Sequence, residues 1–305
     1  MSRATVSERF RGPHSIHFEQ ATFGLFLVIP LILILVGLLL YPMISSVLVS
    51  FQAKVIGSPG RFVGLGNYRE LLTRDQVFWE VFLNTCLYAV ASVFFKLILG
   101  FLAAVFLNER IRAQSLFRGW ILLPWIIPTL VVGLMFRWMF DQTGGVLNFI
   151  IARLGIMKVP PAWLAQSWLA RGAVIFANVW RGFPFFMICI LAGLQSINPE
   201  LYEAAAMDGA RELQRLTYIT IPSVRSIIRV VIILSIIWTY NDFELLWVMT
   251  SGGPSYATHI FVTYAYQLSF EGSRFGYASA VSLITTPLVI VFILLLLPRL
   301  MRDDA

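Results

Sequence analysis

The sequence predicts an all-α membrane protein built on six transmembrane helices. Hydrophobic residues make up 58% of the chain and charged residues only 13%, whereas a soluble domain carries about 25% charged residues. The mean hydropathy is +0.79. Six apolar runs are long enough to cross a bilayer, for which a helix needs about 20 residues. Between two of these runs lies a polar segment that is too charged to sit in lipid.

The six predicted crossings are distributed over almost the whole chain. They cover residues 21–51, 84–107, 116–140, 172–194, 223–249 and 277–297. The first run is too long for a cleaved signal peptide and follows a polar tail, so we expect a membrane anchor. One membrane domain over residues 21–298 is therefore expected, with short tails at 1–20 and 299–305.

The placement of Arg and Lys predicts the orientation of the chain. With the N-terminus in the cytoplasm, the inner segments hold more Arg and Lys than the outer ones, as the positive-inside tendency requires. Both tails and the polar loop at 197–222 are then cytoplasmic. Anionic lipid headgroups and this topology explain the net charge of +7, so no nucleic-acid partner is expected.

Reactive side chains are few. Cys86 and Cys189 lie inside apolar runs, which predicts free, buried thiols. No other potential metal ligands accompany the three histidines, His14, His17 and His259, in the sequence. We interpret all three as surface residues. The sequence contains no catalytic constellation and no phosphate-binding loop for ATP, so we expect neither an enzyme nor a resident metal or cofactor.

The polar segment at 203–222 is predicted to be a helical hairpin on the membrane surface. Asn198 can cap the first helix, and Pro199 suits its first position. Gly209 then breaks the helix, and a second polar helix is expected to run to Pro222. Such a protruding hairpin has a shape that suits docking into a recess on another protein.

Polar side chains within two predicted crossings share helix faces. Residues at the spacing i, i+3, i+4 or i+7 lie on one face; they are Asn178, Arg181, Gly182 and Phe185 in the fourth crossing, and Ser235, Thr239 and Asp242 in the fifth. Polar groups inside a membrane are costly and often mark a transport pathway. Hydroxyl, amide and carboxylate groups beside aromatic rings suit a polyhydroxylated ligand. The alternative is that these groups only hold the helices together.

The charged residues of the crossings raise two further questions. We hypothesise that Arg181 pairs with Asp242 or Glu244. Lys96 lies near the middle of the second crossing, too deep for its amine to reach the interface easily. We therefore expect Lys96 to face protein or a water-filled cavity, in a role that the sequence does not define.

Two groups of motifs give the chain a family resemblance. Glu203-Ala204-Ala205, three residues, Gly209, nine residues and then Ile219-Thr220-Ile221-Pro222 resemble the EAA loop of ATP-driven importer permeases, with Ile221 where the family has Leu. Nearly the whole chain is similar to the larger permease subunit of maltose-type carbohydrate ABC importers. The motifs that carry this similarity include Gly64-Leu65-Gly66-Asn67-Tyr68, Leu191-Ala192-Gly193-Leu194-Gln195, Tyr240-Asn241-Asp242-Phe243 and Thr250-Ser251-Gly252-Gly253-Pro254.

The resemblance implies a type I ABC importer permease fold with a cytoplasmic EAA coupling helix. It implies as partners a second homologous permease, two ATPase subunits that bind ATP and Mg, and an extracytoplasmic solute-binding protein. Import would proceed by alternating access through the inner membrane. Contacts with the ATPase would come from Glu203, Ala204, Ala205, Met207, Asp208, Gly209 and Arg211.

When the family's substrate contacts are carried over motif by motif, the resemblance implies seven sugar contacts. They are the same seven residues that lie on the two helix faces. Arg181 replaces an apolar residue of the maltose relatives, and Thr239 and Asp242 replace amides. These departures leave a sugar as the expected substrate and put maltose itself in doubt.

Two other functions remain open on the sequence. Arg181 also suits an importer of glycerol phosphate or another polyol. Asp242, Glu244, Arg181 and Lys96 could serve an ion-coupled secondary sugar carrier, although such carriers usually show repeated halves, and none is visible here. A membrane enzyme would need a catalytic constellation that the chain lacks.

Overall fold

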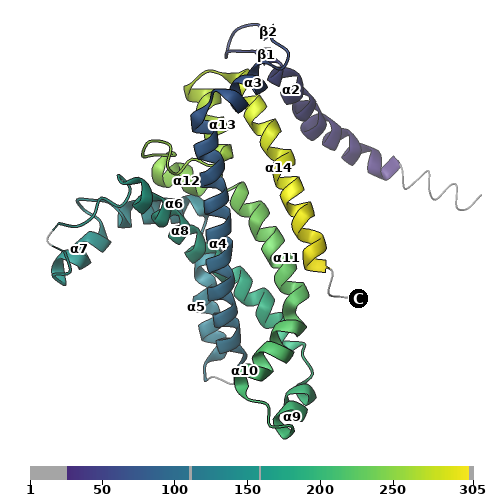
Figure 1. The fold of residues 1–305 in the computed structure, drawn as a ribbon, viewed down its shortest axis with the longest axis vertical. Helices are drawn as coiled ribbons and strands as arrows, with labels where there is room; N and C mark the ends of the chain where they lie inside the picture. The colour runs from purple at the N-terminus through teal and green to yellow at the C-terminus, as the bar shows by residue number, and fades with distance from the viewer. Residues whose placement is uncertain (1–25, 110–111, 158, 302–305) are drawn as a thin grey trace, which may run out of the picture.

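The computed structural model describes residues 26–109, 112–157 and 159–301, and within them the chain is mainly helical (Figure 1). The predicted tail at 1–20, with His14 and His17, lies outside the described residues, as does 302–305. The longer elements are α2 (Tyr41–Ser50), α4 (Gln76–Asn108), α5 (Gln114–Ile126), α6 (Thr129–Met139), α8 (Ser167–Gln195), α11 (Ile221–Tyr240) and α14 (Phe275–Met301). The shorter ones are β1 (Gln52–Ala53), β2 (Arg61–Phe62), α3 (Gly66–Thr73), α7 (Val146–Arg153), α9 (Pro199–Met207), α10 (Glu212–Arg215), α12 (Phe243–Thr250) and α13 (Phe261–Tyr266).

Helices α4 and α8 form the central pair of the bundle. They pack along each other, and α11 and α5 pack against them. Gly100 makes this close approach possible, because a Cβ there would collide with the Cβ of Phe186. Small residues at helix contacts in membranes serve the same purpose generally. Side chains of α4, α8 and α11 then interdigitate in a core that includes Leu107, Phe186, Ile190 and Val224.

The third predicted crossing, 116–140, is not one straight helix. It is divided into α5 and α6, which meet at an angle of 90°. Pro128 stands at the break, and Ile127 before it has an extended backbone with ψ of 132°. A residue that precedes proline is driven out of the helical region by the proline ring. The expectation of one helix over 116–140 was therefore wrong, whereas a crossing made by the bent pair stays a prediction.

The fifth predicted crossing, 223–249, is displaced along the chain. The helix runs continuously from Glu212 to Tyr240, through a π-helical turn at Leu216–Thr220. It therefore passes Pro222, where we expected the polar helix to end, and the π-helical turn that changes the backbone hydrogen-bond pattern ends two residues before this proline. It ends before Asn241 and Asp242, and the separate helix α12 follows.

Four helices of the described chain are long and apolar enough to cross a membrane, and the bent α5–α6 pair would make a fifth. The four are Phe26–Ser50, Gln76–Asn108, Ser167–Gln195 and Glu212–Tyr240. Helix α14, with 27 residues, covers the predicted sixth crossing. The first of these helices extends away from the bundle in Figure 1, and its apolar window has no buried residue. Six crossings remain a prediction that these lengths allow.

One end of the bundle is closed by a small hairpin. Strands β1 and β2 pair antiparallel beside α3. The buried Asn67 donates from Nδ2 to the carbonyls of Ser50 and Gln52, at 2.7 and 2.9 Å. Tyr68 shares a hydrogen bond with the Ser50 hydroxyl at 2.7 Å. The motif at 64–68 therefore anchors the chain between the first helix and α4.

Candidate functional site

A cavity of about 450 Å³ lies between α4, α5, α8, α11 and the start of α12. The structure brings together all seven residues that the sequence selected as substrate contacts. The cavity is lined by Asn178, Arg181, Gly182 and Phe185 from α8, and by Ser235, Thr239 and Asp242 from α11 and the turn after it. Lys96, Trp125, Thr129, Trp238, Asn241 and Glu244 complete most of the lining. That these side chains contact a substrate remains a prediction.

Lys96 belongs to this site, although the sequence did not define its role. Its side chain leaves α4, crosses Gly182 on α8 and reaches α11. A Cβ on Gly182 would lie 2.5 Å from Cε of Lys96, so the glycine keeps this passage open. The Lys96 amine donates to Thr239 Oγ1 at 3.1 Å and lies 3.5 Å from Ser235 Oγ. The available signal was a single Lys in a long apolar run, but both of its hydrogen-bond partners lie on α11, 139 and 143 positions further along the chain.

Asp242 forms a second polar centre. One carboxylate oxygen accepts from the Tyr88 hydroxyl at 2.7 Å and from Asn178 Nδ2 at 2.6 Å. These donors come from α4 and α8 and hold Asp242 where α11 has ended. Arg181 forms no ion pair within 4 Å with either acid of the cavity in the described chain, and its Nε is buried without a hydrogen-bond partner. The hypothesis of an Arg181 pair with Asp242 or Glu244 is therefore wrong for this conformation.

Aromatic rings form one wall of the cavity. The ring of Phe185 stacks on Trp125 with centroids 5.9 Å apart, and it meets Trp238 edge-on at 4.9 Å. The sequence selected Phe185 but not Trp125, which lies in the bent α5–α6 pair. Aromatic faces beside hydroxyl, amide and charged groups suit a ligand with both apolar faces and hydroxyl groups.

Comparison with known proteins shows the family to which this fold belongs. The family described as "Binding-protein-dependent transport system inner membrane component" matches residues 96–299, which is more than half of the chain. The chain belongs to this family. It is therefore an inner-membrane permease component of a binding-protein-dependent transport system. Permeases of this kind are transport components rather than enzymes.

Relatives of the permease include named sugar transport proteins. It is 32% identical over 289 residues to the trehalose/maltose transport system permease protein MalF of Thermococcus litoralis, covering 94% of this chain and 97% of the relative. It is 33% identical over 242 residues to the maltose/maltodextrin transport system permease protein MalF of Vibrio cholerae, covering 74% of this chain and 46% of the relative. The permease is thus of the sugar-transport type, as the sequence motifs indicated.

A solved structure shares the fold. A chain of a bacterial ABC transporter involved in the import of the acidic polysaccharide alginate superposes with a TM-score of 0.83. It is 24% identical and covers 96% of the permease and 100% of that chain. The likeness supports a helical ABC importer permease fold.

The predicted coupling segment forms a helix, a turn and a second helix at the end of the permease opposite β1 and β2 (Figure 1). Asn198 caps α9 by accepting from the backbone N–H of Glu200 at 3.1 Å. Gly209 has a φ of +78°, a conformation that glycine adopts without steric cost. No residue of α9 or α10 is buried, and Met207 is 89% exposed. The seven predicted coupling residues lie in this segment, and their role remains a prediction.

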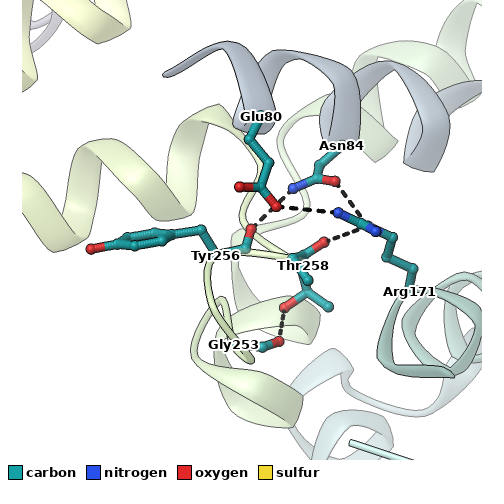
Figure 2. Close-up of polar contacts among 7 residues, drawn as sticks. Glu80, Asn84, Arg171, Gly253, Tyr256 and Thr258 are labelled. Atoms are coloured by element: carbon teal, nitrogen blue, oxygen red, sulfur yellow. Dashed lines mark hydrogen bonds and ion pairs between the residues drawn. The ribbon is translucent and has the colours of Figure 1, made fainter. Parts of the chain in front are cut away.

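A polar cluster joins α4, α8 and the segment between α12 and α13 (Figure 2). Arg171 pairs with Glu80 at 3.3 Å and donates from Nε to Asn84 Oδ1 at 3.0 Å and to the Ala257 carbonyl at 3.1 Å. Asn84 in turn donates to the Tyr256 carbonyl at 3.0 Å. Sequence reasoning missed this cluster because its members lie up to 172 positions apart.

Three predictions about reactive side chains need correction. His259 is buried rather than on the surface, with 2% of its area exposed, and its Nδ1 lies 3.1 Å from Thr263 Oγ1. Gly252 packs directly against its ring. Cys86 and Cys189 are free, as expected, but Cys86 is exposed and Cys189 half-buried in this chain. Apolar helices of a membrane protein turn many side chains outward, so an apolar run does not imply burial.

Proposed function

We propose that this chain is the permease subunit of an ATP-driven importer that moves a mono- or oligosaccharide into the cytoplasm by alternating access. A solute-binding protein delivers the sugar from outside. A second homologous permease completes the pathway, and an ATPase dimer binds ATP and Mg. Both termini of this chain lie in the cytoplasm.

The observation that carries the proposal is the cavity between α4, α8 and α11. It combines hydroxyl groups, an amide and a carboxylate with the aromatic wall of Phe185, Trp125 and Trp238. Directional polar groups recognise sugar hydroxyls, and rings cover the C–H faces. Relatives named as trehalose and maltose permeases support a sugar.

The exposed tip formed by α9 and α10 supports ATP-driven coupling. Its small residues, Ala204 and Ala205, allow a helix to sit deep in a groove. Met207 provides an apolar anchor that this chain leaves exposed. Movement of the tip would be transmitted to the cavity along α11, because the helix from Glu212 to Tyr240 is continuous.

The first test is recovery of the assembled transporter. We expect a tagged permease, purified in mild detergent, to carry an ATPase, a second permease and a binding protein that mass spectrometry identifies. A cysteine introduced as Met207→Cys should crosslink to the ATPase. Recovery of the chain alone, even after this crosslinking, would contradict the coupling role.

The second test separates ATP-driven import from ion-coupled transport, the alternative that Asp242 and Glu244 keep open. The assembled transporter in proteoliposomes should take up radiolabelled sugar only with ATP, and an ionophore should leave the rate unchanged. Uptake without ATP that an ionophore abolishes would establish a secondary carrier instead. Glycerol 3-phosphate in the same assay tests the polyol alternative that Arg181 favours.

A further inference from the structure

Two cationic side chains face the cavity from different helices. Lys96 comes from α4 and Arg181 from α8, and both contribute to the lining. Lys96 is 5% exposed and its nearby oxygens, Ser235 Oγ and Thr239 Oγ1, are neutral hydroxyls. Neither cation forms an ion pair within 4 Å in the described part of the chain. A charge held inside a membrane without a counter-ion is costly.

The acids of the cavity do not neutralise these cations by contact. Asp242 uses one carboxylate oxygen to accept from Tyr88 and Asn178, both neutral donors. Glu244 stands exposed at the start of α12. The cationic groups therefore retain N–H donors for a ligand.

Two buried polar atoms at the cavity have no partner. They are Nε of Arg181, a donor, and Oδ1 of Asn178, an acceptor. Asn178 is 4% exposed, and its amide is fixed by the bond from Nδ2 to Asp242. A buried polar group left unpaired is destabilising, so a ligand that supplies both an acceptor for the arginine and a hydroxyl donor for the amide gains affinity.

We propose that the cavity selects a sugar or polyol that carries an anionic group, either a carboxylate or a phosphate. This inference rests on the proposed importer function and deepens it. Arg181 and Lys96 bind the anionic group, because guanidinium and ammonium donors form strong, charge-assisted hydrogen bonds with carboxylate or phosphate oxygens. Asn178 accepts from a hydroxyl, and the rings of Phe185 and Trp238 cover the carbon skeleton.

Gly182 is part of this selectivity. It allows the Lys96 side chain to pass over α8, and a larger residue would displace the amine from the cavity. Gly182→Ala should therefore lower uptake of the anionic substrate in the same direction as loss of Lys96.

The test measures uptake by the complete transporter, with its binding protein and ATPase, in proteoliposomes containing ATP. The probes are matched pairs that differ at one position: glucose against glucuronate and glucose 6-phosphate, and the galactose and mannose equivalents. We expect the wild-type transporter to prefer an anionic member about tenfold or more over its neutral partner, because a site built for a polar group rejects the analogue that lacks it.

Variants locate the preference in this cavity. Arg181→Met and Lys96→Met should each lower uptake of the anionic probe about tenfold or more and reduce the ratio of anionic to neutral uptake, while Arg181→Lys should retain part of the anionic uptake. The matched control is Arg137→Met. Arg137 is an exposed cation on α6 that contacts the Val248 carbonyl and does not line the cavity.

The outcomes distinguish this inference from the proposed function. A preference for carboxylate or for phosphate identifies which anionic group the site takes. Uptake of neutral sugars alone, or an anionic preference that survives both methionine variants, would overturn the inference and leave the sugar importer in place. An assembled complex that transports neither these probes nor neutral or acidic oligosaccharides would overturn both. Recovery of the ATPase with each variant shows that it has folded.

Discussion

The two ends of the permease differ in how many of their residues are held by contacts within the chain itself. At the β1–β2 end, Asp75 accepts from the hydroxyls of Tyr264 and Tyr277 at 2.8 and 2.7 Å, and Arg274 pairs with Glu70 at 2.7 Å. At the α9 end, no residue of α9 or α10 is buried. The first end is stabilised from within, whereas the second presents a shaped surface that only another protein would cover.

The α9 end should be the more sensitive to mutation in function and the less sensitive in stability. We expect Met207→Asp to lower ATP-driven uptake about 100-fold or more, because burying an unpaired carboxylate in an interface costs several kcal/mol and each 1.4 kcal/mol is a factor of ten. The melting temperature should not change, since Met207 is 89% exposed. Uptake assays and thermal unfolding in detergent measure the two effects.

Two controls make this comparison specific. Met207→Leu should keep uptake near wild type, because it preserves an apolar anchor of similar size. Val159→Glu changes a residue that is 81% exposed in a loop predicted to face outward, and it should leave ATPase recovery unchanged. Equal loss in both charged variants would mean that α9 has no special docking role.

The β1–β2 end should show the opposite behaviour. Asp75 also caps α4, accepting from the backbone N–H of Phe78 at 3.0 Å. Asp75→Ala should lower stability by about 2–3 kcal/mol, through a lost cap and lost charge-assisted bonds, or about 3–5 °C in melting temperature for a chain of this size. Recovery of the ATPase through α9 should persist, as co-purification at low temperature would show.

A double-mutant cycle tests whether the tyrosines carry this effect. Burial, and then the hydrogen bond to the Asp75 carboxylate, raise the pKa of Tyr264, so the hydroxyl remains a donor. Tyr264→Phe in the Asp75→Ala background should therefore cost less than it does alone. Strict additivity would show that the contact contributes nothing to stability.

The sequence could predict the features that depend on residues close to one another in the chain. Apolar runs and helical spacing are local properties, so they identified the helices around the cavity and the faces of α8 and α11 that line it. The α9 hairpin was also readable, because Asn198, Pro199 and Gly209 act on the backbone beside them. Whether the selected residues bind substrate or the ATPase stays a prediction.

Features that depend on distant partners were missed. Hydropathy continues through Pro128 and Asn241, so the right-angle break and the early end of α11 were hidden. Asp242 is held by donors on two other helices, and Lys96 reaches α11 only because position 182 on a third helix is glycine. The predicted Arg181 ion pair failed for the same reason, because a shared helix face does not determine which neighbour an acid accepts from.

The smallest expected effect is that of His259, which belongs to the β1–β2 half of the permease. Burial lowers the pKa of His259 from 6.5 to about 4, outside the predicted membrane-spanning segments. The unfolded chain therefore takes up a proton before the folded chain does as the pH falls. Stability should be full above pH 6.5 and decline towards pH 4, by about 1–3 kcal/mol in total.

Thermal unfolding at pH 7 and pH 5 should show this decline, and His259→Gln should remove that part of the pH dependence. An unchanged difference between the two pH values in the variant would assign the effect to other groups.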